Sequence, residues 1–228
     1  MLDVTLAMAR LLDGHAREHD ASECLSADMA LAGIATALFH DSGYIRRTRD
    51  TRHHNGAAYT RVHVSRGARF LRDFLPEAGL ERIAPVCTRI IHYTGYEREP
   101  EEFVLEDPGE HLLGMLLGTA DLMAQMADSN YLHKCREHLY QEFVTAGLAD
   151  AGHSDEATGT IYRSPEQLLR MTPAFILNAI DVRLNGHFSG VHRYAAAHFG
   201  GRHLYMEAIT ANSRRLEILL AGEAQDTP

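Results

Sequence analysis

Two aspartates stand where an ionised side chain is costly. Asp121 lies within "EHLLGMLLGTADLMAQMA", residues 110–127, which is apolar nearly all round, and Asp41 continues the apolar stripe of residues 27–41. A lone buried carboxylate must be paired, protonated or bound to a cation. Two inward-facing carboxylates on different helices can therefore share one metal ion. A salt bridge or a helix cap is the structural alternative, and either aspartate alone fits both interpretations.

Three histidines extend this acidic pair into a candidate metal site. His40 adjoins Asp41, His63 begins an apolar helical stripe, and His92 ends the helical stretch "APVCTRIIH". A single histidine at a helix end is more often a hydrogen-bonded structural residue. Here, however, each member of the ordered set lies at the inner face or the end of a separate expected helix. Imidazole and carboxylate ligands suit Mn, Fe, Ni, Zn and, less well, Mg, and no thiolate joins them as in a structural zinc site. The set predicts one or two divalent ions bound by His40, Asp41, His63, His92 and Asp121.

Arginines after the His-Asp pair could contact an anionic substrate. The polar loop at residues 43–56 contributes Arg46, Arg47, Arg49 and Arg52, and Arg66 lies on the helix that follows. Guanidinium groups can neutralise a phosphate. The alternative is a solvated surface partnered by the acidic loop at residues 97–110. The candidate catalytic residues are Asp41 and Arg66, and the candidate substrate-binding residues are Tyr44, Arg46 and Arg66.

Helices must position these side chains, because nearly every segment has a 3.6-residue hydrophobic period. The expected helices cover residues 3–19, 27–41, 63–75, 80–92, 110–127, 131–146 and 203–221, with two or three shorter ones between 164 and 199. Ser164 and Pro165 form an N-terminal helix signal. Alternating β-branched runs, which mark strands, are missing. The sequence predicts an all-α fold in one domain over residues 1–228, with a core of about 2–146 and a helical extension of about 160–222.

Bulk composition narrows the class of protein. The 228 residues carry a net charge of −9, which disfavours a protein that coats nucleic acid. Three widely spaced cysteines predict free thiols in a reducing compartment, and no leader or membrane span is visible in the sequence. We therefore expect a cytoplasmic protein without a membrane partner.

The stretch "ALFHDSGY" resembles the signature of the HD superfamily of metal-dependent phosphohydrolases, an all-α family whose ligands run His … His-Asp … Asp. The resemblance covers about residues 2–146 and implies an HD-domain-like helical bundle. It maps the His-Asp pair to His40 and Asp41 and the final Asp to Asp121. Two-metal members carry two further histidines, which match His63 in "HVSRGARFL" and His92 in "IIHYTGY".

The resemblance implies a phosphohydrolase or phosphodiesterase that attacks a nucleotide-like or other small phosphoester with a metal-activated water, Asp41 bridging two ions. A homodimer is one oligomeric state open to it. Two alternatives follow from the same ligand order. One is a degenerate HD domain that binds a nucleotide or a partner without catalysis, and the other is a di-iron oxygenase similar to myo-inositol oxygenase.

Two positions depart from the family pattern. "LDVTLAMARLL" is similar to the stretch that directly follows the family's opening His, which would place that ligand just before Met1. Either a histidine precedes the sequence given, or the site is natively incomplete, or His15 or His19 substitutes, although both lie far along the first helix. Many relatives also have Lys where this chain has Tyr44, which changes the handling of phosphate at that position.

Overall fold

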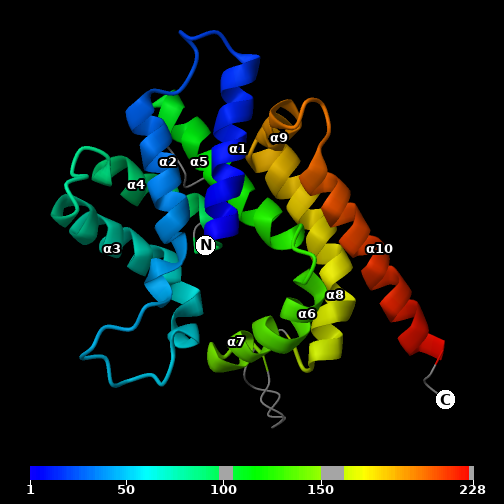
Figure 1. Cartoon of the computed structure of the whole chain (residues 1–228). Helices are drawn as coiled ribbons and strands as arrows, with labels where there is room; N and C mark the ends of the chain where they lie inside the picture. Colours follow the sequence, from blue (N-terminus) through cyan, green and yellow to red (C-terminus); the bar gives the residue numbers. More distant parts are fainter. Residues whose placement is uncertain (98–104, 150–161, 226–228) are drawn as a thin grey trace.

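The computed structural model describes residues 1–97, 105–149 and 162–225. The all-α prediction is confirmed: within these residues every regular element is a helix, and the one sheet-like pairing is an isolated bridge between Ala149 and Tyr162. The α-helices are α1 Leu2–Glu18, α2 Ala27–Phe39, α3 His63–Glu77, α4 Ala84–Ile90, α5 Pro108–Met126, α6 Tyr131–Lys134, α7 Tyr140–Thr145, α8 Pro165–Asn178, α9 Tyr194–His198 and α10 Leu204–Gln225 (Figure 1). Short 3₁₀ turns are η1 His40–Tyr44, η2 Gly56–Val62, η3 Ile91–Thr94 and η7 Val191–Arg193, and π-helical turns are η5 Cys135–Leu139 and η6 Ala179–His187.

Helix α5 is the centre of the molecule. It packs against α1, α2, α4 and α10, and Figure 1 shows it passing behind α1 and α2. Leu113 and Leu117 on α5 are fully buried and belong to one continuous apolar cluster that runs from Val4 on α1 to Leu216 on α10. A helix that is apolar nearly all round must be covered on all sides. The C-terminal helices supply part of this cover.

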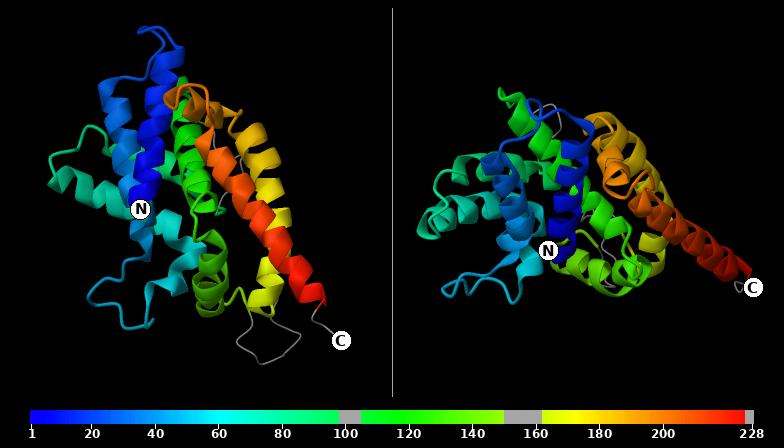
Figure 2. Two further views of the ribbon diagram at one scale, coloured as in Figure 1. Left: turned by 45° about the vertical axis from the view of Figure 1, so that its right-hand side comes forward. Right: turned by 45° about the horizontal axis from the view of Figure 1, so that its top comes forward.

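Close helix contacts depend on small residues. Gly14 on α1 faces the start of α9, and a Cβ added there would lie 1.7 Å from the carbonyl oxygen of Tyr194. Only glycine permits this approach of two backbones. The contact fastens the C-terminal helices to α1, and α8 and α10 then run alongside one another (Figures 1 and 2).

Several expected boundaries are confirmed. The side chain of Ser164 accepts a hydrogen bond from the backbone N–H of Gln167 at 3.1 Å, with Pro165 at the first helical position of α8. Helix α2 is shorter than expected, because it ends at Phe39 and passes into the 3₁₀ turn η1. The loop expected at residues 43–56 is followed by η2. Tyr59 of η2 is buried, and its ring centroid lies 3.5 Å from Cζ of the Arg66 guanidinium.

Candidate functional site

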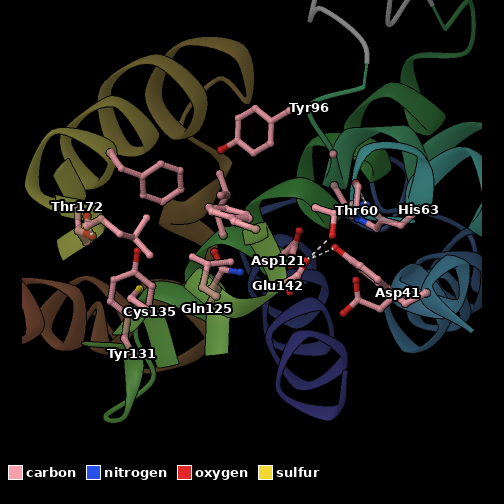
Figure 3. A pocket seen from close by; sticks show the side chains of 18 of the residues that line it. Asp41, Thr60, His63, Tyr96, Asp121, Gln125, Tyr131, Cys135, Glu142 and Thr172 are labelled. Carbon is pink, nitrogen blue, oxygen red and sulfur yellow. Dashed lines mark hydrogen bonds between the residues drawn. The ribbon is translucent and has the colours of Figure 1, made fainter. Parts of the chain in front are cut away.

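Four of the five predicted metal ligands line one cavity of about 310 Å³. His40 and Asp41 come from η1, His63 from the first residue of α3, and Asp121 from the last third of α5. Figure 3 shows Asp41, His63 and Asp121 at one end of the cavity, with Thr172, Tyr131 and Cys135 at the other. Residues up to 81 positions apart in the sequence thus meet at one point, as the ordered set predicts.

His40 is oriented by backbone on one side and by carboxylates on the other. Its Nδ1 lies 2.8 Å from the carbonyl oxygen of Ala37. A carbonyl can only accept, so Nδ1 carries a proton and donates it. The other nitrogen, Nε2, lies 3.2 Å from Oδ2 of Asp41 and 3.6 Å from Oδ1 of Asp121. The imidazole, which is only 3% exposed, therefore directs Nε2 at both carboxylates.

These contacts shift the pKa values of His40, Asp41 and Asp121. Burial lowers the pKa of His40, but the hydrogen bond to Asp41 and the charge of Asp121 outweigh it and raise the pKa to about 9. Burial alone raises the pKa of Asp41, but the hydrogen bond and charge of His40 outweigh it and hold that pKa below its ordinary value. Burial raises the pKa of Asp121, against the charge of His40. Without a metal ion, the imidazolium of His40 thus pairs with the ionised carboxylate of Asp41 near neutral pH, beside Asp121, which holds its proton more tightly than usual.

His63 repeats the arrangement of His40. Its Nδ1 donates to the carbonyl oxygen of Thr60 at 2.7 Å, which leaves Nε2 available for a ligand. The ring of Tyr44 stacks on the imidazole at a centroid distance of 4.4 Å. A histidine whose Nδ1–H is held by a carbonyl and whose Nε2 is available is the usual form of a metal-binding histidine.

Glycines allow the two histidine-bearing segments to touch. A Cβ on Gly43 would lie 1.7 Å from the carbonyl oxygen of His63, and one on Gly67 would lie 2.9 Å from Ile91 and 3.2 Å from the carbonyl oxygen of His40. The His63, Gly67, Leu71 spacing therefore has a structural cause. Gly67 lets η1 lie against the first turns of α3, and Leu71 is fully buried beneath it.

Glu142, on α7, is a site residue that the sequence did not indicate. Its Oε1 accepts hydrogen bonds from the hydroxyl of Tyr44 at 2.8 Å and from Oγ1 of Thr60 at 2.9 Å (dashed in Figure 3). Burial and the adjacent carboxylate of Glu142 raise the pKa of Tyr44, so the phenol stays protonated and donates. Because Tyr44 stacks on His63 and Thr60 binds its Nδ1, Glu142 holds both supports of that imidazole.

The opposite wall of the cavity is apolar and comes from the C-terminal region. Helix α8 contributes Leu168, Met171, Thr172 and Phe175, and the aromatic residues Tyr96, Phe143 and Tyr162 complete the wall. The rings of Phe143 and Tyr162 stack at 5.4 Å. The cavity therefore has a charged end and an aromatic end.

Arg183, from the C-terminal region, is a second residue that sequence reasoning missed. Buried to 7% exposure, it donates to the carbonyl oxygens of Tyr93 and Gly95 and lies 4.2 Å from the ring of Tyr96. It thereby fixes the segment after η3 that forms part of the cavity wall. A cation isolated in the sequence gave no sign of this contact.

Three predicted site residues do not line this cavity. His92 is buried in η3, outside the set of residues that form the cavity wall. Arg46 donates to the carbonyl oxygens of His54 and Asp50, and Arg66 donates to those of Gly43 and Ile45. Both arginines line a separate hollow on the other side of η1. Their roles toward a substrate remain predictions.

The start of α1 lies beside the charged end of the cavity. Met1 and Asp3 line a neighbouring cavity of similar volume, about 320 Å³, together with His40, Asp41 and Asp121. Half of the acidic loop expected to face the arginines, residues 98–104, lies outside the described residues.

The donor types fit a divalent cation, although the side chains as they stand do not enclose one. Within the part of the chain that the structure describes, no three His, Cys, Asp or Glu side chains are grouped so as to hold a metal ion. Among the described residues that line the cavity there is also no lysine or arginine, whereas Asp41, Asp121 and Glu142 bring three carboxylates. Over the same described residues, no helix has the length and apolarity that a membrane span requires.

Comparisons with known proteins return no family model, no curated protein and no solved structure that matches this chain. The chemistry of the cavity is therefore the basis on which a function is inferred.

Proposed function

We propose that the chain is a metal-dependent phosphohydrolase or phosphodiesterase of the HD type, which hydrolyses a nucleotide-like or other small phosphoester with a metal-activated water. One observation carries this proposal: two backbone-anchored imidazoles and two carboxylates converge on a cavity whose described lining contains no arginine or lysine. A phosphoester is anionic, and Asp41, Asp121 and Glu142 would repel it. Bound cations would supply the missing positive charge.

His40, Asp41, His63 and Asp121 would hold the ion or ions, with His92 as a further expected ligand. When two ligand atoms each lie about 2.1 Å from one ion and the angle between the two bonds is roughly 90–110°, the ligand atoms lie about 3.0–3.4 Å from each other. The distances from Nε2 of His40 to Asp41 and Asp121, 3.2 and 3.6 Å, are close to these values. A divalent ion bound there supplies a water of lowered pKa and a Lewis acid for a phosphate oxygen.

The chain's own residues would orient the site and select the substrate. Glu142, through Tyr44 and Thr60, holds the ring of His63 in place. The aromatic end, formed by Phe143, Tyr162 and Phe175, would accept a planar or apolar group. With a volume of about 310 Å³, the cavity is at the small end for ligand sites and favours a substrate no larger than a mononucleotide.

The proposal is tested by metal content and hydrolysis measured on the same protein. Chain reconstituted separately with Mn, Fe, Ni, Zn or Mg is analysed for metal and assayed with p-nitrophenyl phosphate, bis(p-nitrophenyl) phosphate and a panel of mononucleotides. We expect one or two ions per chain, and a fall in turnover of about 100-fold or more in Asp41→Asn and Asp121→Asn. The matched control is Asp181→Asn, which removes an exposed carboxylate outside the cavity.

A non-catalytic role is the second candidate, and one observation favours it. The imidazolium of His40 already forms an ion pair with Asp41 and lies 3.6 Å from Asp121, so the three side chains could form a purely structural cluster. Failure of every metal to bind, with wild-type chain as inactive as Asp41→Asn, would reject the hydrolase and support this candidate.

A further inference from the structure

A second hollow lies on the side of η1 that faces away from the cavity. It has a volume of about 940 Å³ and is bounded by the loop after η1 and by α3. The charged residues that line it are seven arginines and two aspartates: Arg46, Arg47, Arg49, Arg52, Arg66, Arg69, Arg72, Asp50 and Asp73. They give the hollow an excess of five positive charges, on a chain whose net charge is −9. Such a concentration of cations costs free energy unless an anion offsets it.

The neighbouring groups compensate these charges only in part. Arg52 lies 3.6 Å from Asp50 and Arg72 lies 2.9 Å from Asp73. Arg47, Arg49 and Arg69 make no ion pair with any residue that the structure describes. These three exposed guanidinium groups therefore retain their full hydrogen-bonding capacity.

The arginines also repel one another. Burial lowers the pKa of Arg66, and the charges of Arg47 and Arg69 lower it further against the opposing charge of Asp50. Arg66 remains in place because it donates to the carbonyl oxygens of Gly43 and Ile45. The structure thus holds like charges together at a cost, which is typical of a site that receives an anion.

Ser42 provides an independent indication of a ligand. It lines the hollow and is only 4% exposed, and its hydroxyl has no hydrogen-bond partner among the described residues. Buried hydroxyls nearly always have a partner, and a group bound in the basic hollow that Ser42 lines would supply one.

We propose that this hollow binds a small polyphosphate anion, such as the triphosphate of a nucleotide or inorganic triphosphate, through Arg47, Arg49 and Arg69 at the rim and Ser42 at the base. Several phosphates match the excess of five positive charges better than one does. Guanidinium groups bind phosphate oxygens in pairs and suit such a ligand. Nucleic acid fits less well, because the basic residues converge on a hollow and the whole chain is acidic.

The site is distinct from the catalytic cavity. The residues that line the two do not overlap, although both include members of η1: His40, Asp41 and Tyr44 face the cavity, while Ser42 and Gly43 face the hollow. An anion in the hollow would thus rest against the turn that carries the His-Asp pair. The proposal does not depend on the proposed hydrolase activity.

Titration calorimetry with inorganic triphosphate tests the proposal on the full chain, with EDTA present so that no divalent ion bridges ligand and protein. We expect Arg47→Gln and Arg69→Gln each to weaken binding about five- to tenfold, since each removes one charge-assisted contact. The matched control is Arg214→Gln, an exposed arginine on α10, which should change the dissociation constant less than twofold.

Two further variants separate the hollow from the cavity and from the fold. Ser42→Ala should weaken binding about threefold or more without lowering the thermal unfolding temperature, because the hydroxyl has no partner to lose within the described protein. Asp121→Asn, in the cavity, should leave triphosphate affinity unchanged. The proposal is overturned by no binding of triphosphate at millimolar concentration, by equal weakening in Arg214→Gln, or by loss of binding in Asp121→Asn. Tighter binding of a single-stranded oligonucleotide than of triphosphate would also overturn it.

Discussion

The buried imidazole of His40 predicts that the metal-free protein loses stability as the pH rises from 6.5 to 9. Its Nε2 lies against Asp41 and Asp121, and its pKa in the folded protein is about 9. In the unfolded chain the same group has a pKa near 6.5. The folded state therefore binds this proton more tightly than the unfolded state does.

The sign and size of the effect follow from these two values. A raised histidine pKa contributes stability that is fully present below pH 6.5 and is lost as the pH rises through about 9. Each pH unit between the two pKa values corresponds to about 1.4 kcal/mol, so the contribution of His40 is about 3 kcal/mol. Burial lowers the pKa of His15, His192 and His203, so these are neutral in both states above about pH 7.5 and add little there.

Urea unfolding of EDTA-treated protein at pH 7, 8 and 9 measures the effect. We expect the free energy of unfolding of the wild-type chain to fall by about 2–3 kcal/mol over this range. His40→Gln should show a clearly smaller fall than the wild-type chain, because it keeps only the contributions of other groups with raised pKa values, such as the buried Cys87 and Cys135 thiols. The exposed control Asp181→Asn should keep the wild-type slope. A wild-type profile flat to within about 0.5 kcal/mol, or an equal slope in His40→Gln, would refute the assignment of an imidazolium between two carboxylates.

Three other predictions follow from the geometry. A metal ion must displace the Nε2 proton of His40, so binding of Mn²⁺ at pH 7.5 should release about one proton per chain from this group. Calorimetry in two buffers of different ionisation enthalpy measures the number of protons released. No release would contradict the raised pKa of His40. Gly43→Ala should destabilise the chain by more than about 3 kcal/mol in urea unfolding, since the new Cβ meets a carbonyl oxygen at 1.7 Å, whereas Gly222→Ala, with no atom within 4 Å, should be neutral. Glu142→Ala should lower metal affinity about 10- to 100-fold by releasing Tyr44 and Thr60, while Glu142→Gln, which can still accept both hydrogen bonds, should stay within about threefold of wild type; equal losses in the two variants would show that the charge matters instead.

Local periodicity predicted most helices and the convergence of four of the five expected ligands, whereas His92, the fifth, lies outside the cavity wall, in a 3₁₀ turn after a shorter helix than expected. Asp41 and Asp121 were conspicuous because each continues an apolar stripe, and burial of a charge demands an explanation wherever the chain folds. His40 and His63 followed from their places at the start or end of such stripes. All four line the same cavity in the structure.

The partners that hold these residues were not predictable in the same way. Glu142 lies 98 residues from Tyr44 in the sequence, on an amphipathic helix whose other charges are exposed. Nothing local distinguishes it from a solvated glutamate, since its role arises only when α7 meets η2. The aromatic wall from α8 has the same origin, because its side chains resemble ordinary core residues until the helix is docked.

The arginines show how a small difference in helical geometry changes the interpretation of a sequence. From the sequence, Arg46, in the loop after the His-Asp pair, and Arg66, on the helix that begins at His63, were candidate contacts for the phosphate of a substrate. In the structure the helix ends at Phe39, and the chain continues as the 3₁₀ turn η1. His40, Asp41 and Tyr44 line the cavity, whereas Ser42, Gly43 and Ile45 line the basic hollow with both arginines. One tightened turn thus separates carboxylates from guanidinium groups, and a phosphate in the cavity would be neutralised by bound ions while the arginines remain available to a different anion.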